Sequence, residues 1–251
     1  MPLPPPFEAR VVGGRALSPG VREVSLERTD GQPLVFEPGQ WVNLILPAPG
    51  ELPSGEPSAL KRSYSIASPP AGSPRFEIAV TRVQDGPGST FLHEVAPGTT
   101  LQCIGPQGFF TRAASSTSPS LFIATGTGVT PMRSMIQAAV AAGATSPMWL
   151  LFGVRRETDV LYADEMSALA RQHPAIRFEP TLSQPSDRWQ GRRGYVQAHV
   201  KELWAELTAA TSGATPHAYI CGLERMVGSV REILRTDLGL PRQQVHSERY
   251  D

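Results

Sequence analysis

Hydrophobic and polar residues follow two different patterns in the two halves of the 251-residue chain. From Glu8 to about Gly108, short runs of β-branched or alternating residues are separated by turn signals such as "TDGQP", "EPGQ" and "APGT". Alternation with a period of two is typical of half-buried strands, and turns at this spacing favour antiparallel neighbours. The first half is therefore predicted to be an antiparallel barrel or sandwich.

The second half alternates apolar, strand-like runs with helical patterns. The strand-like runs are "SLFIAT", "PMWLLFGV", "AIRFEPTL", "HAYICG" and "QVHSERY". Near-continuous apolar strands separated by helices indicate a parallel, doubly wound sheet that is covered on both faces. The prediction is a five-stranded α/β unit.

Two stretches have no hydrophobic period. Pro47 to Leu60 is rich in Pro, Gly and Ser, so we expect an exposed loop between two strands. Thr111 to Ser120 is small and polar and is the best candidate for a linker. The predicted domains are residues 1–115 and 116–251.

Charge and composition give no indication of a nucleic-acid or membrane partner. The 23 basic and 23 acidic residues give a formal net charge of zero, which does not favour nucleic acid or a membrane surface. The N-terminal "MPLPPPFEAR" lacks the charged and apolar regions of a signal peptide, and no run approaches the ~20 apolar residues that span a bilayer. A cytoplasmic, soluble protein is expected.

The chain has two cysteines, Cys103 and Cys221. Two thiols are too few for an iron-sulfur cluster held by four thiolates or for a cysteine-based zinc site, so no metal is predicted. A disulfide between them is the alternative, but a cytoplasmic setting favours two free thiols.

A candidate phosphate site follows the first strand of the second half. The apolar run Leu121 to Ala124 leads into Gly126, Thr127 and Gly128, and a helix is expected near Pro131. Glycines allow close approach of the backbone, and helix N-terminal amides favour a phosphate. The strict G-x-G-x-x-G pattern is absent, so a tight turn without a ligand is the alternative.

The ends of the other strands add candidate residues at the same edge of the sheet, where ligands of such folds bind. Solvated loop charges and a cysteine that only packs are the alternative interpretation. The candidates are Arg155, Arg156, Ser183, Arg192, Arg193, Tyr195, Cys221 and Gly222.

In the first half, "KRSYSIAS" places polar groups in a predicted strand. Arg62 suits a phosphate and Tyr64 suits a flat ring, while alternation points Ser65 to the other face. Downstream, "QDGPGSTFLHEV" is expected to open a short helix with Ser89 or Thr90 as N-cap. Taken singly, each of these features is more often structural.

Together the motifs resemble the ferredoxin-NADP(H) reductase superfamily, in which an FAD-binding antiparallel barrel precedes a nicotinamide-nucleotide domain. "RSYS" looks like its R-x-Y-[ST] flavin motif and "GPGS" like its G-x-x-S pyrophosphate motif. "GPQGFF", "GTGVTP" and "CGLERM" are similar to its G-P-x-G-x-F segment, its nucleotide loop and its C-G-x-x-x-M segment. The resemblance implies a six-stranded barrel and an enzyme that passes electrons from NAD(P)H through FAD.

The resemblance also implies residue roles. Arg62 would pair with the FAD pyrophosphate, Tyr64 would lie on one flavin face, and Ser65 would sit near the reactive N5 edge. Tyr250 would cover the other face, although Asp251 follows it here. The implied catalytic residues are Ser65, Cys221 and Tyr250. The implied cofactor-binding residues are Arg62, Ser63, Tyr64, Ser65, Ile78, Ala79, Val80, Thr81, Gly86, Gly88, Ser89, Thr90, Gly126, Thr127, Gly128, Val129, Thr130, Arg155, Arg156, Ser183, Arg193, Tyr195, Cys221, Gly222, Met226 and Tyr250.

The choice of nucleotide depends on groups that bind a 2'-phosphate. NADP-specific members of the family have a Ser-Arg pair followed by a Lys and a Tyr. Here Ser183 and Tyr195 keep their residue types and Arg193 keeps the positive charge of the lysine, but Gln184 replaces the arginine, for which Arg155 or Arg156 could compensate. NADPH is slightly favoured over NADH. The acceptor is expected to be a separate redox protein, such as ferredoxin, flavodoxin or an oxygenase component, or else a small molecule, because these cysteines cannot hold an iron-sulfur centre. A monomer is expected.

Two other functions stay open at this point. The same scaffold could serve as a flavin- or nucleotide-sensing subunit without enzymatic activity, since a fold does not fix a function. A nucleotide-binding enzyme without flavin would keep the Gly126 loop and make Arg62 and Tyr64 structural.

Overall fold

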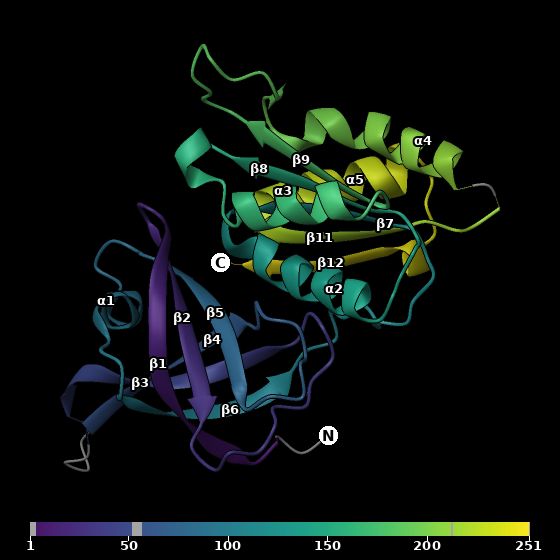
Figure 1. Ribbon diagram of the computed structural model, residues 1–251. Coiled ribbons are helices and arrows are strands. Elements are labelled where there is room, and N and C mark those ends of the chain that lie inside the picture. Colours follow the sequence, from purple (N-terminus) through teal and green to yellow (C-terminus); the bar gives the residue numbers. More distant parts are fainter. Residues whose placement is uncertain (1–3, 52–56, 212, 251) are drawn as a thin grey trace. The chain divides into compact units, whose positions relative to one another are not determined.

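The computed structural model describes residues 4–51, 57–211 and 213–250, and it divides into two compact units (Figure 1). The first unit extends to residue 113 and includes residues 133–138; the second comprises residues 114–132 and 139–251. The domain boundary between residues 115 and 116 stays a prediction. In the part of the chain that is described, no helix is both long enough and apolar enough to span a membrane.

The first unit contains a six-stranded antiparallel sheet with the order β4-β3-β6-β1-β2-β5. An isolated bridge between Ile66 and Ile78 joins the two edges and closes the sheet into a barrel. The elements are β1 (Pro6–Ser18), β2 (Val21–Arg28), β3 (Trp41–Glu51), β4 (Pro57–Ser65), β5 (Arg75–Thr81), α1 (Pro87–Glu94) and β6 (Thr100–Gln107). The predicted six-stranded barrel is confirmed.

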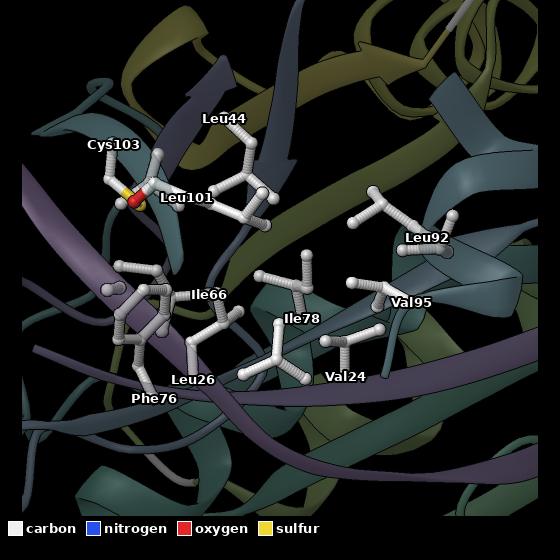
Figure 2. Close-up of a cluster of buried hydrophobic side chains, with 14 of the residues drawn as sticks. Val24, Leu26, Leu44, Ile66, Phe76, Ile78, Leu92, Val95, Leu101 and Cys103 are labelled. Carbon is white, nitrogen blue, oxygen red and sulfur yellow. The ribbon is translucent and has the colours of Figure 1, made fainter. Parts of the chain in front are cut away.

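Alternate side chains of each strand fill the barrel, as the period of two predicts. Val24 and Leu26 of β2 face Phe76 and Ile78 of β5 in the cluster shown in Figure 2. Leu92 from α1 joins the same cluster, which fixes the helix to the barrel wall.

The strands β3 and β4 extend further than the sequence indicated. Leu46 pairs with Leu60, and Glu51 pairs with Pro57, so strand pairing continues into the segment predicted as a loop. β4 is the last strand in the hydrogen-bonded order, and a proline that lacks an N–H is tolerated on such an edge. Residues 52–56 of that predicted loop lie outside the described residues.

The second unit contains a parallel sheet with the order β10-β9-β8-β7-β11-β12. Five of these strands are the predicted ones, and the sixth, β10, has two residues and is too short to produce a hydrophobic period. The strands are β7 (Ser120–Thr125), β8 (Met148–Val154), β9 (Ile176–Leu182), β10 (Arg192–Arg193), β11 (His217–Leu223) and β12 (Val245–Tyr250).

Helices cover both faces of this sheet (Figure 1). Leu121, Ile123 and Ile220 pack with Leu203 of α4 and Val227 of α5 on one face. Phe122 and Ala124 alternate with these residues in β7, so they point to the other face, where they are also buried. The helices are α2 (Val129–Ala141), α3 (Ala163–Gln172), α4 (Val200–Ala210) and α5 (Glu224–Glu232).

The order of the strands creates a switch point between β7 and β11. From β7 the chain builds outward through β8 and β9, and it then returns to place β11 and β12 on the opposite side of β7. Ligands of doubly wound sheets bind at the carboxyl ends of the strands at such a point. Strands β7 and β11 end side by side at this point, because Cys221 pairs with Ala124. The segments that follow them therefore begin next to each other.

Candidate functional site

Strand β4 carries the polar residues that the sequence singled out in the barrel. The Arg62 side chain is exposed, Tyr64 is half-buried against the barrel core, and Ser65 is buried with 6% of its surface exposed. Arg62 and Tyr64 pair with Leu44 and Val42, so both lie on the same face of the strand.

Burial raises the pKa of the Tyr64 phenol to about 12, and the nearby Arg62 guanidinium opposes that shift. The phenol is therefore neutral at physiological pH. A neutral, half-buried ring beside a cation is suited to lie against a flat heterocycle whose phosphate group the cation contacts.

Helix α1 begins earlier than predicted. Gly86 is the N-cap and has no side-chain cap, so neither Ser89 nor Thr90 caps the helix as expected. The Ser89 hydroxyl instead accepts a hydrogen bond from the Val83 amide (3.1 Å) and donates one to the Gly86 carbonyl (3.0 Å). Pro87 supplies a φ that is already helical at the first position, which explains the earlier start.

The start of α1 lies directly against Arg62. A Cβ atom added to Gly88 would lie 3.4 Å from Arg62 Cγ and 3.2 Å from Leu46 Cδ1. The glycine therefore keeps the helix N-terminus open at the point where the guanidinium stem passes it. Helix amides without a side-chain cap and an adjacent arginine fit the pyrophosphate of FAD.

Two residues that sequence reasoning missed hold α1 in this place. Arg22 of β2 donates to the carbonyls of His93 (2.5 Å) and Val95 (3.3 Å) at the C-terminal end of the helix. The His93 ring donates from Nε2 to the Val80 carbonyl (2.9 Å). An arginine in an alternating strand looks solvent-facing, so the sequence carries no signal of this role.

In the second unit, β7 runs into a 3₁₀ turn at Gly126–Gly128 and then into α2. Gly126 has a φ of +53°, which favours glycine. A Cβ added to Gly128 would lie 2.3 Å from the Cys221 carbonyl oxygen, so only glycine fits there. The helix expected near Pro131 begins at Val129, because the preceding turn leads directly into it, and Pro131 is the third residue of α2.

The end of β11 completes this edge of the second unit. Gly222 has a φ of +151°, and a Cβ there would lie 2.2 Å from the Thr125 hydroxyl oxygen and 2.7 Å from Met226 Cε. The Thr125 hydroxyl is buried and has no hydrogen-bond partner among the described residues. Thr125 was not predicted as a site residue, although its position directly before Gly126 could have indicated it.

The C-terminal strand β12 brings Tyr250 to the nucleotide loop. Tyr250 pairs with Leu223, and its hydroxyl lies 3.4 Å from the Thr130 hydroxyl. Thr130 donates to the Thr127 carbonyl at 2.7 Å. The contact of Tyr250 with a flavin stays a prediction, and Asp251 lies outside the described residues.

The candidate residues after β8 and β9 differ in how they are engaged. Arg155 and Arg156 are exposed, and Tyr195 has 72% of its surface exposed. Arg193 is also exposed and donates to the carbonyls of Trp189 (2.8 Å) and Ser186 (3.3 Å).

Arg192, by contrast, is engaged within the protein. It forms ion pairs with Glu179 at 3.0 Å and with Glu202 at 2.9 Å. The hydrogen bond that the Arg192 guanidinium donates to the Glu202 carboxylate is the largest cause that raises the pKa of Arg192. Arg193, which is exposed and donates to backbone carbonyls, is therefore the better candidate of the pair for an anionic ligand.

Both thiols are buried and free. Burial raises the pKa of Cys103 to about 12 and that of Cys221 well above its ordinary value. Since the thiolate is the reactive form, both thiols are expected to resist a thiol reagent such as Ellman's reagent at pH 8 in the folded protein. In denaturant two thiols should react, because unfolding returns each pKa to about 8.5. Rapid labelling of either thiol in the folded protein would contradict this expectation.

No group of three or more histidine, cysteine, aspartate or glutamate side chains is placed to hold a metal ion in the described ranges. The features at both candidate sites are those of phosphate and ring binding.

Comparison with known proteins identifies the family. A model of the oxidoreductase FAD-binding domain matches residues 8–111, and a model of the oxidoreductase NAD-binding domain matches residues 122–232. Ferredoxin--NADP reductase B of Sorangium cellulosum (strain So ce56) is 58% identical over 246 residues, which cover 98% of each chain. The chain belongs to the ferredoxin reductase family of FAD- and NAD(P)-binding oxidoreductases.

Other members of the ferredoxin reductase family are more distant. Phenol hydroxylase P5 protein of Acinetobacter pittii (strain PHEA-2) is 27% identical over 97% of this chain, which spans 65% of that protein. The Amycolatopsis cytochrome P450 reductase GcoB has a TM-score of 0.81 at 26% identity, covering 98% of this chain and 69% of its own. A ferredoxin NADP+ reductase from Neisseria gonorrhoeae with bound FAD and NADP has a TM-score of 0.79 at 20% identity, over 97% and 98% of the chains, and shows the shared fold.

The resemblance inferred from five motifs is confirmed, as are the enzyme class, the antiparallel barrel and the parallel α/β sheet. An FAD-binding and a nicotinamide-nucleotide-binding domain are likewise confirmed for this ferredoxin reductase family member. The roles of individual site residues stay predictions.

Proposed function

We propose that the protein is a reductase that takes electrons from NADPH and passes them through FAD to a separate ferredoxin-type carrier. The observation that carries this proposal is the 58% identity to ferredoxin--NADP reductase B over 98% of both chains. FAD, when bound, supplies a centre that accepts electrons in pairs and can release them singly, which suits transfer from a nicotinamide to a one-electron carrier.

In the first unit, Arg62 and the open start of α1 would hold the FAD pyrophosphate, and Tyr64 would pack against the flavin ring. Ile78–Thr81 in β5 would line the flavin by backbone contacts. This assignment is supported by the hydrogen bond from His93 to the Val80 carbonyl, which ties the phosphate-binding helix to that strand. Ser65 is assigned to the reactive edge of the flavin.

In the second unit, the turn at Gly126–Gly128 and the start of α2 would bind the pyrophosphate of NADPH. Thr125, Cys221 and Gly222 would surround the nicotinamide, where the buried Thr125 hydroxyl can serve its carboxamide. The 2'-phosphate would be bound by Ser183, Arg193 and Tyr195, with Arg155 or Arg156 as a further cation, because these groups follow β8 and β9 at the same edge of the sheet.

The test begins with the visible spectrum of the purified protein under anaerobic conditions. A flavin band that bleaches on addition of NADPH, and reduction of cytochrome c by NADPH that requires added ferredoxin, is the expected result. A colourless protein, or a flavin that NADPH and NADH both leave oxidised, would exclude the proposal.

The nucleotide preference is tested by Arg193→Ala. Loss of the guanidinium is expected to lower the ratio of kcat/KM for NADPH over NADH about tenfold, which corresponds to about 1.4 kcal/mol of selective binding. Steady-state kinetics with both nucleotides measure the ratio, and Arg188→Ala in the same loop is the matched control. An unchanged ratio in Arg193→Ala would assign the 2'-phosphate to other residues.

A further inference from the structure

The loop that carries Arg193 has little apolar support of its own. Residues 183–195, the specificity loop, connect β9 to the 3₁₀ turn Val196–His199 that precedes α4. Eleven of its thirteen residues lie outside helices and strands. The other two, Arg192 and Arg193, form β10 and pair with Thr181 and Leu182 of β9. None of these thirteen residues is among the buried hydrophobic residues in the described part of the chain, so polar contacts fix the position of Arg193.

His199 is the last residue of the 3₁₀ turn that follows the loop, and it contacts the loop through both ring nitrogens. Nε2 lies 3.0 Å from the Arg193 carbonyl oxygen and 3.1 Å from the Thr181 hydroxyl oxygen. Nδ1 lies 3.3 Å from Nη1 of Arg192. The imidazole therefore joins the loop, strand β9 and the start of α4.

The partners define the protonation of this ring. An arginine can only donate, so Nδ1 accepts from Arg192 and carries no proton. Nε2 then carries the proton and donates to the Arg193 carbonyl and the Thr181 oxygen. The Thr181 hydroxyl in turn donates to the Gly194 carbonyl at 2.9 Å. One neutral imidazole and one fully buried hydroxyl thus hold three consecutive loop residues.

The fixed Arg192 determines where Arg193 points. Neighbouring residues of a strand face opposite sides, so the ion pairs of Arg192 with Glu179 and Glu202 leave Arg193 on the outer side. Among the charged groups, the Arg192 guanidinium contacts the His199 ring and the Glu202 carboxylate interacts with it electrostatically. At the other end of the loop, the Glu157 carboxylate accepts from the amide and the hydroxyl of Ser186, at 2.9 and 2.6 Å.

We propose that His199 is a positioning residue for nucleotide selection: by holding residues 192–194 it keeps Arg193 in place for the 2'-phosphate of NADPH. The inference rests on the proposed function of Arg193 in that role. His199 itself contacts the loop backbone and two side chains and needs no contact with the nucleotide. Its loss should therefore weaken the binding of NADPH more than that of NADH and leave the chemistry intact.

The test compares His199→Leu with His199→Gln, whose amide can still donate and accept. His199→Leu is expected to raise the KM for NADPH about tenfold with kcat within about twofold of wild type and the KM for NADH little changed. His199→Gln should recover most of the loss. Thr181→Val, which keeps the side-chain shape, should shift the KM for NADPH in the same direction, and it serves as the second variant if His199→Leu does not fold. His173→Leu is the histidine control outside the loop.

A second readout needs no nucleotide. Amide hydrogen exchange of residues 186–195 in the FAD-loaded protein should be about tenfold faster in His199→Leu, with exchange in β7 and β8 unchanged. Unchanged loop exchange, or equal rises in the KM for NADPH and NADH, would overturn the inference.

Parallel kinetics of Arg193→Ala separate the two proposals. If Arg193→Ala lowers the nucleotide ratio and His199→Leu does not, the inference fails alone. If Arg193→Ala leaves the ratio of kcat/KM for NADPH over NADH unchanged, Arg193 does not bind the 2'-phosphate. The proposed role of His199 in nucleotide selection is then wrong as well.

Discussion

Replacing Arg62 with alanine is expected to yield a protein that loses most of its FAD during purification. The side chain runs along the open start of α1 at Gly88, where a guanidinium and helix amides can contact the same pyrophosphate. A charge-assisted hydrogen bond of this kind contributes about 2–3 kcal/mol. The dissociation constant for FAD should therefore rise by about 30- to 160-fold. The ratio of flavin to protein absorbance after gel filtration, and fluorescence titration of the apoprotein with FAD, measure the change.

Lys61→Ala is the matched control for this variant. Lys61 is also an exposed cation in β4, but it precedes Arg62 and points to the opposite face of the strand. It should retain flavin like the wild type, and added FAD should partly restore the activity of Arg62→Ala. If both variants lose flavin equally, the effect is one of general charge. If Arg62→Ala retains wild-type flavin, the assignment of the pyrophosphate is wrong.

Much of the fold was predictable because its signals are local. The alternation in β2 and β5, and the apolar runs of β7, β8 and β11, each reflect burial on one or both faces. Glycine positions were informative for the same reason. Gly128 is required by the close approach of the Cys221 backbone, and Gly222 by its positive φ and the nearby Thr125 hydroxyl, and such local requirements leave one residue type in the sequence.

The residues that support the site were not predictable, because their partners are distant in the sequence. Arg22 holds carbonyls about 70 positions away, and nothing in "VREVSLER" distinguishes this arginine from a solvated one. The same holds for Arg192 and Arg193, which are neighbours of identical type. Only the structure shows that carboxylates of β9 and α4 engage the first and leave the second exposed.

Local propensity also misplaced both helix starts at the sites. Ser89 and Thr90 are good N-cap residues, yet Pro87 begins α1 and places Ser89 inside the first turn. Pro131 suits a first helical position, yet the turn at Gly126–Gly128 starts the helical path five residues before it. In both cases the helical path begins at the glycines without a side-chain cap, which leaves amides open where we propose that a phosphate binds.

Replacing Gly128 with alanine is expected to abolish most nicotinamide-dependent activity while FAD remains bound. The new Cβ would lie 2.3 Å from the Cys221 carbonyl oxygen and 2.9 Å from the Gly222 amide nitrogen. Both are backbone atoms of β11, which is paired on both sides, so no side chain can move aside. The nucleotide loop must shift by about 1 Å from the strand end, and a displacement of that size can cost about 100-fold in rate.

Gly228→Ala is the matched control, because the same substitution in α5 meets no atom within 4 Å. It should leave activity unchanged and stabilise the protein by about 0.5–1 kcal/mol, since alanine loses less conformational entropy in a helix than glycine does. Stopped-flow reduction of the flavin by NADPH is the decisive measurement, with Tm and flavin content recorded for each variant. A Gly128→Ala protein that keeps its flavin and reduces it at the wild-type rate would show that nucleotide binding does not use this turn. Loss of flavin from that variant would instead show that the strain spreads beyond the nucleotide-binding unit, since the proposed pyrophosphate contacts of FAD all lie in the barrel.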